Sequence, residues 1–306
     1  FFQADDGIRD FCLSRGLGDV YKRQHQYMLF FTQKGKCFWM RVYEIPEGSR
    51  ISKGRAIQNL INIEQDDRVK AFICTQDLKD EDYINNHFVI MATKKGQVKK
   101  TSLEQYSRPR ANGINAITIK DDDELLEAKL TNGNSQILLA VKSGKAIRFE
   151  EGKTRPMGRG ASGVRGITLA DKNDEVVGMI SVNDMDANVL VVSENGYGKR
   201  SKLDDYRMTN RGGKGVKTIS VTDKTGSLVT LKNVTDEDDL MIINKSGIAI
   251  RMAVADLRVM GRATQGVKLI NIKEDDAIAA VAKVMKDDDD VEDISDIDTD
   301  GGTIVE

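Results

Sequence analysis

The chain has 306 residues with 46 basic and 48 acidic side chains, so its formal net charge is −2. It contains no run of 18 apolar residues, which excludes a membrane-spanning helix, and its three cysteines have no paired spacing. Cys12, Cys37 and Cys74 therefore indicate no disulfide framework and favour a reducing compartment. The two histidines lie far apart and have no metal-ligand spacing, so no metal site is expected.

The first 24 residues differ in pattern from everything that follows. They show no alternation of apolar and polar residues, and Leu13–Gln24 resembles the adapter-derived translation found at the ends of metagenomic gene fragments. We expect residues 1–24 to be a foreign leader that is not part of the fold.

A hairpin pattern begins at residue 25 and recurs five times. Each copy has an apolar run, a glycine turn and a second strand that ends in basic residues. The turn glycines are Gly35, Gly96, Gly144, Gly196 and Gly247, spaced by 61, 48, 52 and 51 residues. A polar, acidic insert at 75–87, predicted to be a surface loop, accounts for the longer first interval.

Each copy continues with a loop that ends in a second glycine, 17 or 19 residues after the first. These glycines are Gly54, Gly113, Gly163, Gly215 and Gly266. Alternating strands are predicted after them at Ala56–Ile63, Ile114–Ile119, Val164–Leu169, Val216–Val221 and Val267–Ile272, and a further apolar run closes each copy. Four short strands in about 50 residues predict an all-β, propeller-like array whose neighbouring repeats complete each other's cores. We place the repeats at about 25–87, 88–135, 136–187, 188–238 and 239–285.

Basic residues recur at fixed positions of this repeat. Fifteen residues after the turn glycine stand Arg50, Arg159, Arg211 and Arg262, with Arg110 one position earlier in the second copy. Arg165, Lys217 and Lys268 follow six residues later, and the same loops also contain Lys53, Arg55, Arg108, Arg155, Arg207, Lys214 and Arg258. Equal phase in a radial fold means equal position on every blade, so we expect a basic belt around one rim. The alternative is a set of solvated polar loops.

The stretch 211–221 is the most glycine-rich of these loops. It opens with a box-like run of Arg211, Gly212, Gly213, Lys214 and Gly215 and continues as an alternating strand. Glycine lacks a Cβ atom, so such a loop can bring backbone N–H groups close to an anion. With its lysines and arginine, the loop is predicted to contact phosphate.

Acidic residues follow a different pattern. They gather at 121–124, 171–175, 236–239 and 274–276, where turn formation is the favoured interpretation and catalytic carboxylates are the alternative. Residues 286–306 contain ten acidic residues and one basic residue, which leaves a net charge of +7 for residues 1–285. We predict a disordered tail that either competes with a polyanion for the belt or only adds solubility.

Motifs of catalysis are not found. There is no Walker loop, Rossmann fingerprint, nucleophile elbow or HExxH, so no catalytic residue, cofactor or metal ligand is predicted. The repeats carry charge and shape, which favours a binding module for a long polyanion. A propeller that binds an acidic protein is the competing class.

The period and the basic loops resemble those of the C-terminal domain of the bacterial DNA gyrase A subunit. That family's box is Gln, a basic residue and Arg-Gly-Gly-basic-Gly; Arg211–Gly215 keeps the last five positions, whereas Thr209 and Asn210 depart from the first two. The family's defining box lies in its first blade, so the C-terminal domain of the topoisomerase IV C subunit stays an alternative.

The resemblance implies a fold and a role. The fold would be a six-bladed β-pinwheel, with five complete copies here, whose strands are exchanged between neighbours. Double-stranded DNA would bend around the outer rim and bias strand passage toward negative supercoiling. The partners would be the gyrase B subunit together with the N-terminal catalytic part of the same polypeptide, in an ATP-dependent type IIA topoisomerase of the bacterial cytoplasm and nucleoid. The catalytic tyrosine would lie outside this chain.

Overall fold

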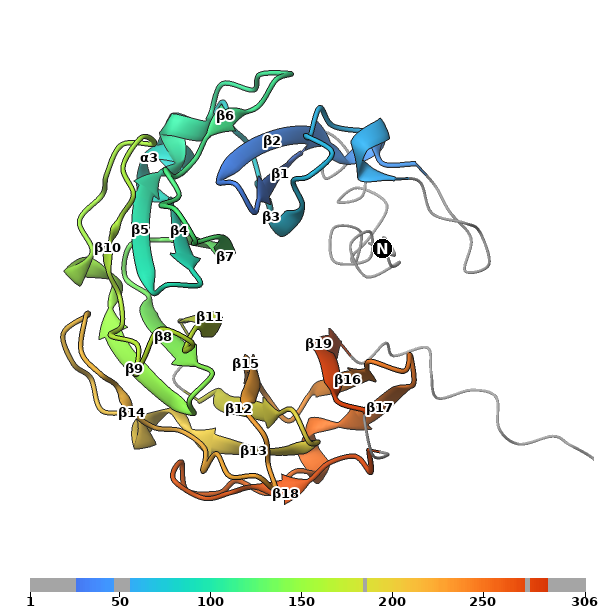
Figure 1. The fold of residues 1–306 in the computed structure, drawn as a ribbon. Helices are drawn as coiled ribbons and strands as arrows, with labels where there is room; N and C mark the ends of the chain where they lie inside the picture. The colour runs from blue at the N-terminus through green and yellow to red at the C-terminus, as the bar shows by residue number, and fades with distance from the viewer. Residues whose placement is uncertain (1–25, 47–55, 184–185, 273–275, 286–306) are drawn as a thin grey trace, which may run out of the picture.

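Five β-sheets are arranged as blades around an arc (Figure 1). The computed structural model describes residues 26–46, 56–183, 186–272 and 276–285. The predicted leader at 1–24, the predicted tail at 286–306 and the site candidates Arg50, Lys53 and Arg55 lie outside the described residues. All sheet pairings are antiparallel, as the repeated hairpins predict.

Three strands of each blade come from one repeat. Those of the first two blades are β1 (Tyr27–Thr32), β2 (Lys36–Arg41), β3 (Val69–Cys74), β4 (Phe88–Thr93), β5 (Gln97–Ser102) and β7 (Leu125–Thr131). Those of the other three are β8 (Gln136–Val141), β9 (Lys145–Glu150), β11 (Val176–Val182), β12 (Asn188–Ser193), β13 (Tyr197–Lys202), β15 (Leu228–Val234), β16 (Asp238–Asn244), β17 (Ala249–Ala253) and β19 (Ile278–Met285). In Figure 1 the last strand of each trio faces the centre of the arc.

The outermost strand of each of the first four blades belongs to the following repeat. These strands are β6 (Ile114–Asn115), β10 (Val164–Arg165), β14 (Val216–Lys217) and β18 (Val267–Lys268), which pair with β2, β5, β9 and β13. The fifth sheet has three described strands, in the order β17-β16-β19. The expected exchange of strands between neighbours is therefore confirmed, and the described chain has five blades.

The exchanged strands are shorter than the sequence predicts. Each of the last four predicted runs is six residues long and contributes two residues to a ladder, because the partner strand ends there at its turn glycine. The chain then bends over that turn: the N–H groups of Ala116 and Thr218 donate to the carbonyl oxygens of Gly35 and Gly144, both at 2.8 Å. Alternation continues beyond the ladder because Ile117 and Ile219 still point into the core.

The first repeat departs from two predictions. The strand predicted over Ala56–Ile63 is wrong: Ile57–Asn59 forms a 3-10 turn, and the described residues contain no preceding blade to supply a partner edge. The insert at 75–87, predicted to be a loop, contains the short helix α3 (Glu81–Asn86), whose first turn is capped by the Asp80 carboxylate. Tyr83 on that helix is buried, and this apolar contact explains why the insert is ordered into a helix.

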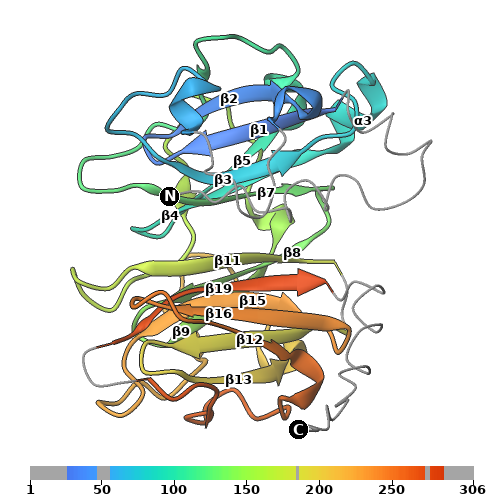
Figure 2. The same cartoon turned by 90° about the vertical axis from the view of Figure 1, so that its right-hand side faces the viewer.

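The hydrophobic core lies between blades. One cluster joins Leu29 and Phe31 of the first blade to Val89 and Met91 of the second, and similar clusters join the second to the third, the third to the fourth and the fourth to the fifth. Figure 2 shows the strands of neighbouring blades stacked edge-on. A fifth cluster, which includes Met28, Phe38 and Ile61, lies within the first repeat. The other four clusters each need two blades, as expected of a repeat array.

Candidate nucleic-acid interface

The glycine-rich loops form the outer rim of the arc. Each loop leaves its own blade after a 3-10 turn, of which η4 (Glu151–Lys153), η5 (Leu203–Asp205) and η6 (Val254–Asp256) are examples, and crosses to the outer edge of the preceding blade. Isolated parallel bridges join Pro156 to Lys100, Met208 to Arg148 and Val259 to Arg200 on the way. The loops of successive repeats therefore overlap along one rim.

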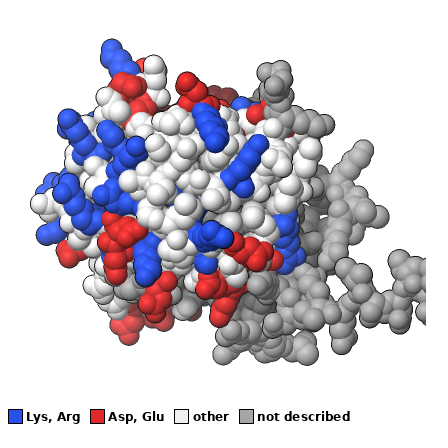
Figure 3. Space-filling view, turned by 90° about the horizontal axis from the view of Figure 1, so that it is seen from below, with Lys and Arg blue, Asp and Glu red and all other residues white. Residues whose placement is uncertain are grey.

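The structure places the described site candidates on this rim. Their side chains are exposed or half-buried: exposed are Arg108, Arg110, Arg155, Arg165, Arg207, Lys214, Lys217, Arg258 and Lys268, and half-buried are Arg159, Arg211 and Arg262. Seen from the side of β14 and β18, Lys and Arg side chains spread over the rim and gather toward one end of the view, while Asp and Glu side chains lie mostly along one edge (Figure 3).

Neighbouring repeats bring two basic residues together at each of two positions. Arg211 Nη1 donates to the carbonyl oxygen of Arg165 at 3.1 Å, and Arg211 Nε donates to that of Lys153 at 3.0 Å. Arg262 Nη1 donates to the carbonyl oxygen of Lys217 at 2.7 Å. We call Arg165 with Arg211, and Lys217 with Arg262, the rim pairs.

The rim pairs have no acidic partner in the part of the chain that the structure describes. Among the ion pairs of the described residues, none involves a member of a rim pair or any other described loop candidate. The hydrogen bonds fix the Arg211 and Arg262 guanidinium groups to backbone carbonyls, which leaves their positive charge without a carboxylate partner among the described residues.

A hollow of about 300 Å³ lies between the loops of the second and third repeats. It is lined by Arg110, Gly113, Ile114, Asn115, Arg159 and Gly160. Arg110 and Arg159, which differ by one position in the phase of adjacent repeats, both line it.

The loop glycines have a packing role that the sequence did not reveal. A Cβ atom on Gly215, whose φ is +72°, would lie 2.6 Å from the carbonyl oxygen of Ala146, and one on Gly163 would lie 2.7 Å from that of Val98. The predicted backbone anion cradle is wrong for Gly212, because its N–H donates to the carbonyl oxygen of Gly166 at 2.6 Å. The glycines thus let each loop lie flat on the preceding blade, and side chains carry the charge outward.

Sequence reasoning missed a second set of contacts between repeats. In the first, third and fourth repeats, the residue four positions after the turn glycine reaches the C-terminal end of the next repeat's 3-10 turn. The Trp39 indole N–H donates to the carbonyl oxygen of Tyr106 at 2.9 Å, Arg148 Nη1 donates to that of Tyr206 at 3.0 Å, and Arg200 Nε donates to that of Leu257. Trp39 is half-buried and makes this contact. The shared position after the turn glycine was a signal that could have identified them.

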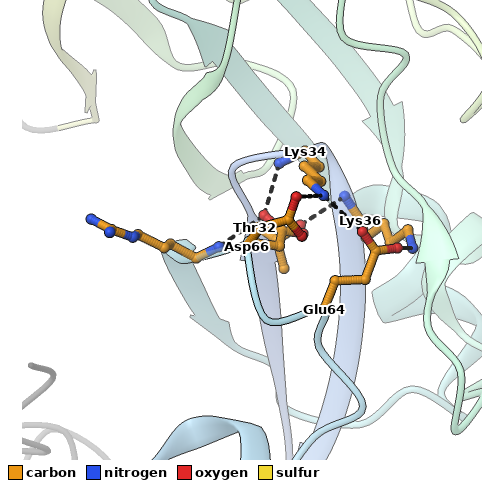
Figure 4. Close-up of polar contacts among 7 residues, drawn as sticks. Thr32, Lys34, Lys36, Glu64 and Asp66 are labelled. Carbon is orange, nitrogen blue, oxygen red and sulfur yellow. Dashed lines mark hydrogen bonds and ion pairs between the residues drawn. The ribbon is translucent and has the colours of Figure 1, made fainter.

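The acidic turn residues take the predicted structural role. The carboxylates of Asp67, Asp123, Asp174 and Asp276 accept N–H groups from the hairpin turn of their own blade, at Lys34, Lys95, Ser143 and Ser246. In the first blade, two lysines of the turn also meet acids (Figure 4). Lys34 Nζ lies 2.8 Å from Glu64 Oε2 and 2.6 Å from Asp66 Oδ2, and Lys36 pairs with Glu64. We call these four side chains the first-hairpin cluster.

The described residues hold no group of His, Cys, Asp and Glu side chains suited to a metal ion. None of their helices is long and apolar enough to cross a bilayer.

The protein is thus a strand-exchanged β-propeller of the anion-binding class. Its rim is basic, and the described residues of that rim make no ion pair with a carboxylate. Comparison with known proteins makes the class specific. The family described as DNA gyrase C-terminal domain, beta-propeller, matches residues 26–76, 87–132, 136–183, 187–235 and 238–285. The chain belongs to this family.

Relatives and solved structures agree with that membership. The chain is 46% identical over 267 residues to the DNA gyrase A subunit of Staphylococcus aureus (strain MRSA252); the match covers 87% of this chain and 30% of the relative. It is also similar to a crystal structure of the C-terminal domain of DNA topoisomerase IV, with TM-score 0.77, 25% identity and coverage of 86% and 80%. A structure of a DNA gyrase A C-terminal domain has the same fold, with TM-score 0.72, 24% identity and coverage of 86% and 83%.

Proposed function

We propose that this chain is the DNA-binding and DNA-wrapping domain of a DNA gyrase A subunit, with duplex DNA held on its outer rim. The observation that carries the proposal is the two rim pairs, in which basic residues of adjacent repeats meet without carboxylates among the described residues. The contacts would come from Arg108, Arg110, Arg155, Arg159, Arg165, Arg207, Arg211, Lys214, Lys217, Arg258, Arg262 and Lys268, together with Arg50, Lys53 and Arg55.

The mechanism follows from polyelectrolyte physics. Bending stiff duplex DNA modestly costs on the order of 1–6 kcal/mol, and a tighter wrap costs more. Each phosphate that meets a lysine or arginine releases condensed counterions, which offsets this cost without reading bases. A rim that held the duplex on a path of one handedness would impose a crossing of one sign on the bound DNA. In the complete enzyme this would bias strand passage toward negative supercoiling.

The fifth blade supports a ring of six blades in the complete protein. Ile250 of β17 is 38% exposed, whereas Ile147 at the same repeat position of β9 is 2% exposed under the loop of the next repeat. A Cβ atom on the turn glycine Gly196 would meet the carbonyl oxygen of Ile270 at 2.7 Å, but no described residue comes within 4 Å of one on Gly247. The outer edge of β17 is thus shaped to receive a short strand from a sixth repeat.

The role of the complete protein is proposed on the same basis. The chain spans 30% of the length of the gyrase A relative it matches. We propose that the catalytic machinery lies in the remainder of that polypeptide. It would act with the gyrase B subunit in an ATP-dependent type IIA topoisomerase at the nucleoid of the bacterial cytoplasm. Identity of 46% to a gyrase A subunit favours this over a topoisomerase IV subunit.

A topology assay tests the wrapping. Relaxed circular plasmid is incubated with the domain, treated with a type I topoisomerase, and freed of protein before electrophoresis. Wrapping leaves supercoils of one sign that increase with the ratio of protein to DNA. Binding to the plasmid with no change in linking number would favour the topoisomerase IV-like alternative. No binding at low salt would favour a propeller that binds an acidic protein.

A further inference from the structure

Two buried lysines stand directly beneath the basic loops. Lys99 in β5 and Lys199 in β13 each lie three positions after their turn glycine, and neither is exposed to solvent. Fully buried lysine is rare unless its ammonium group is satisfied by partners. The equivalent positions in the first and third blades hold Phe38 and Ile147, so an apolar side chain also fits this place in the fold.

Each buried ammonium group binds backbone carbonyls of the loops above it. Lys99 Nζ donates to the carbonyl oxygens of Ala116 at 2.6 Å and Arg159 at 2.5 Å, and so joins the loops of the second and third repeats. Lys199 Nζ donates to those of Gly261 at 2.7 Å and Arg262 at 2.5 Å, and to Thr264 Oγ1 at 3.1 Å. In both blades the lysine thus donates a hydrogen bond to the backbone carbonyl of the phased arginine itself.

We propose that Lys99 and Lys199 are positioning residues that hold Arg159 and Arg262 in their DNA-contacting arrangement, so that the second and fourth blades carry the best-ordered contacts of the rim. This inference rests on the proposed DNA-binding function. The loop of the fourth repeat differs because Ile147, and not a lysine, lies under it; the side chains of Arg211 and Arg262 alike also donate to backbone carbonyls.

The surroundings of the two lysines make this arrangement sensitive to pH. Burial and the nearby Arg159 guanidinium lower the pKa of Lys99 to about 8. Burial lowers the pKa of Lys199 to about 8 as well; Asp205 opposes this shift, and Arg262 and Lys217 add to it. Tyr106 shares the Ala116 carbonyl with Lys99, and burial raises the pKa of that phenol far above its ordinary value. Burial likewise raises the pKa values of the Cys37 thiol and the Tyr206 phenol nearby.

The direction of the effect follows from these shifts. Below a pH of about 8 both groups are charged and donate charge-assisted hydrogen bonds to the loops; above it they are neutral amines, whose remaining N–H groups donate more weakly. The unfolded chain keeps these protons up to the ordinary pKa of about 10.5, so the two lysines make folding more favourable, not less, as pH rises from about 8 to about 10.5. A loss of DNA affinity in this interval therefore does not come from unfolding driven by these groups. Arginines keep their charge throughout.

The experiment measures the affinity of the full chain for a duplex DNA at low salt from about pH 7 to about pH 9.5. Wild type, Lys99→Met with Lys199→Met, and the control Ile147→Met are compared, with melting temperature followed in the same buffers. We expect the double variant to bind roughly tenfold more weakly at pH 7, the loss expected for charge-assisted hydrogen bonds, and the control to bind like wild type. We also expect wild-type affinity to fall with rising pH and that of the double variant to stay flat.

Two results would overturn the positioning role. One is a wild-type DNA affinity that does not change with pH; the other is a folded double variant whose DNA affinity and pH profile match those of wild type. If the double variant does not fold, the wild-type pH profile decides alone. If wild type does not bind DNA at pH 7 and low salt, the proposed function itself is wrong and the positioning role is lost with it.

Discussion

The first-hairpin cluster and the rim pairs use the same kinds of side chain in opposite ways. In the cluster, Lys34 and Lys36 face Glu64 and Asp66, so the charges cancel locally. In the rim pairs, a phased arginine donates to the backbone carbonyl of a basic residue in the preceding repeat, and the described residues offer no carboxylate partner. Exposed ion pairs add little stability, whereas uncancelled like charges oppose it. This difference in charge pairing distinguishes a solvated turn from a surface suited to bind an anion.

Removing charge from the rim pairs should weaken DNA binding, and removing charge from the first-hairpin cluster should not. Arg165→Ala with Lys217→Ala takes away two exposed side chains that make no described ion pair, so folding should be retained. We expect affinity for duplex DNA to fall about a hundredfold at low salt, roughly tenfold per contact. The matched control is Lys34→Ala with Lys36→Ala, measured by the same titration. Equal losses in both variants would remove the distinction between the regions.

The shape of the rim should depend on its glycines. Gly215→Ala forces a Cβ atom against the Ala146 carbonyl at positive φ, and we expect a loss of about 2–3 kcal/mol in the free energy of unfolding. Gly247→Ala is the control, because its φ is also positive but nothing lies within 4 Å of the added atom. Denaturant unfolding should show a clearly smaller loss for the control, about 1 kcal/mol from backbone strain alone. A loss as large for Gly247→Ala would mean that packing on the preceding blade is not the reason for the glycine.

Arg211 should contribute to both stability and binding. Its side chain donates to two backbone carbonyls and also belongs to a rim pair. Arg211→Ala should therefore lower the free energy of unfolding by about 1 kcal/mol and weaken DNA binding as well. Thermal unfolding and a DNA titration on the same preparation separate the two effects. A variant with wild-type DNA affinity and lowered stability would assign Arg211 a structural role only.

The first-hairpin cluster should respond weakly to acid. Hydrogen bonds from Lys34 and Lys36 lower the pKa of Glu64 to about 2, below its ordinary 4.5. A lowered acid pKa contributes stability that is present above pH 4.5 and is lost as pH falls toward 2. Because these side chains are solvent-exposed, the effect should be small and reduced by salt. Melting temperatures of wild type and Glu64→Gln from about pH 6 to about pH 3 test this. Parallel curves would show that the cluster contributes nothing.

Much of this architecture was predictable because one period of about 50 residues governs it. Gly144 and Gly196 stand at the same phase, and so do Arg211 and Arg262; equal phase became equal position on the rim. The carboxylate of Asp174 caps a hairpin turn, as its place between strands predicts. Local signals of this kind depend on neighbours in the chain, so the sequence displays them directly.

The contacts between repeats were not predictable in the same way. Trp39 bonds Tyr106 and Lys199 bonds Arg262, more than 60 residues away in each case. Whether a lysine points outward or is buried depends on which carbonyls another repeat presents to it, and alternation along one strand does not contain that information. The same holds for Gly215, whose requirement for glycine arises from the backbone of Ala146 on the preceding blade.

The salt dependence of binding to a duplex DNA of mixed sequence tests the central claim most directly. If the rim holds phosphates, the logarithm of the association constant should fall linearly with the logarithm of salt concentration, with a slope of roughly −0.9 for each neutralised phosphate. We predict a slope of several units for wild type and a slope about two units shallower for Arg165→Ala with Lys217→Ala. A slope near zero, or one that the double substitution leaves unchanged, would contradict the account.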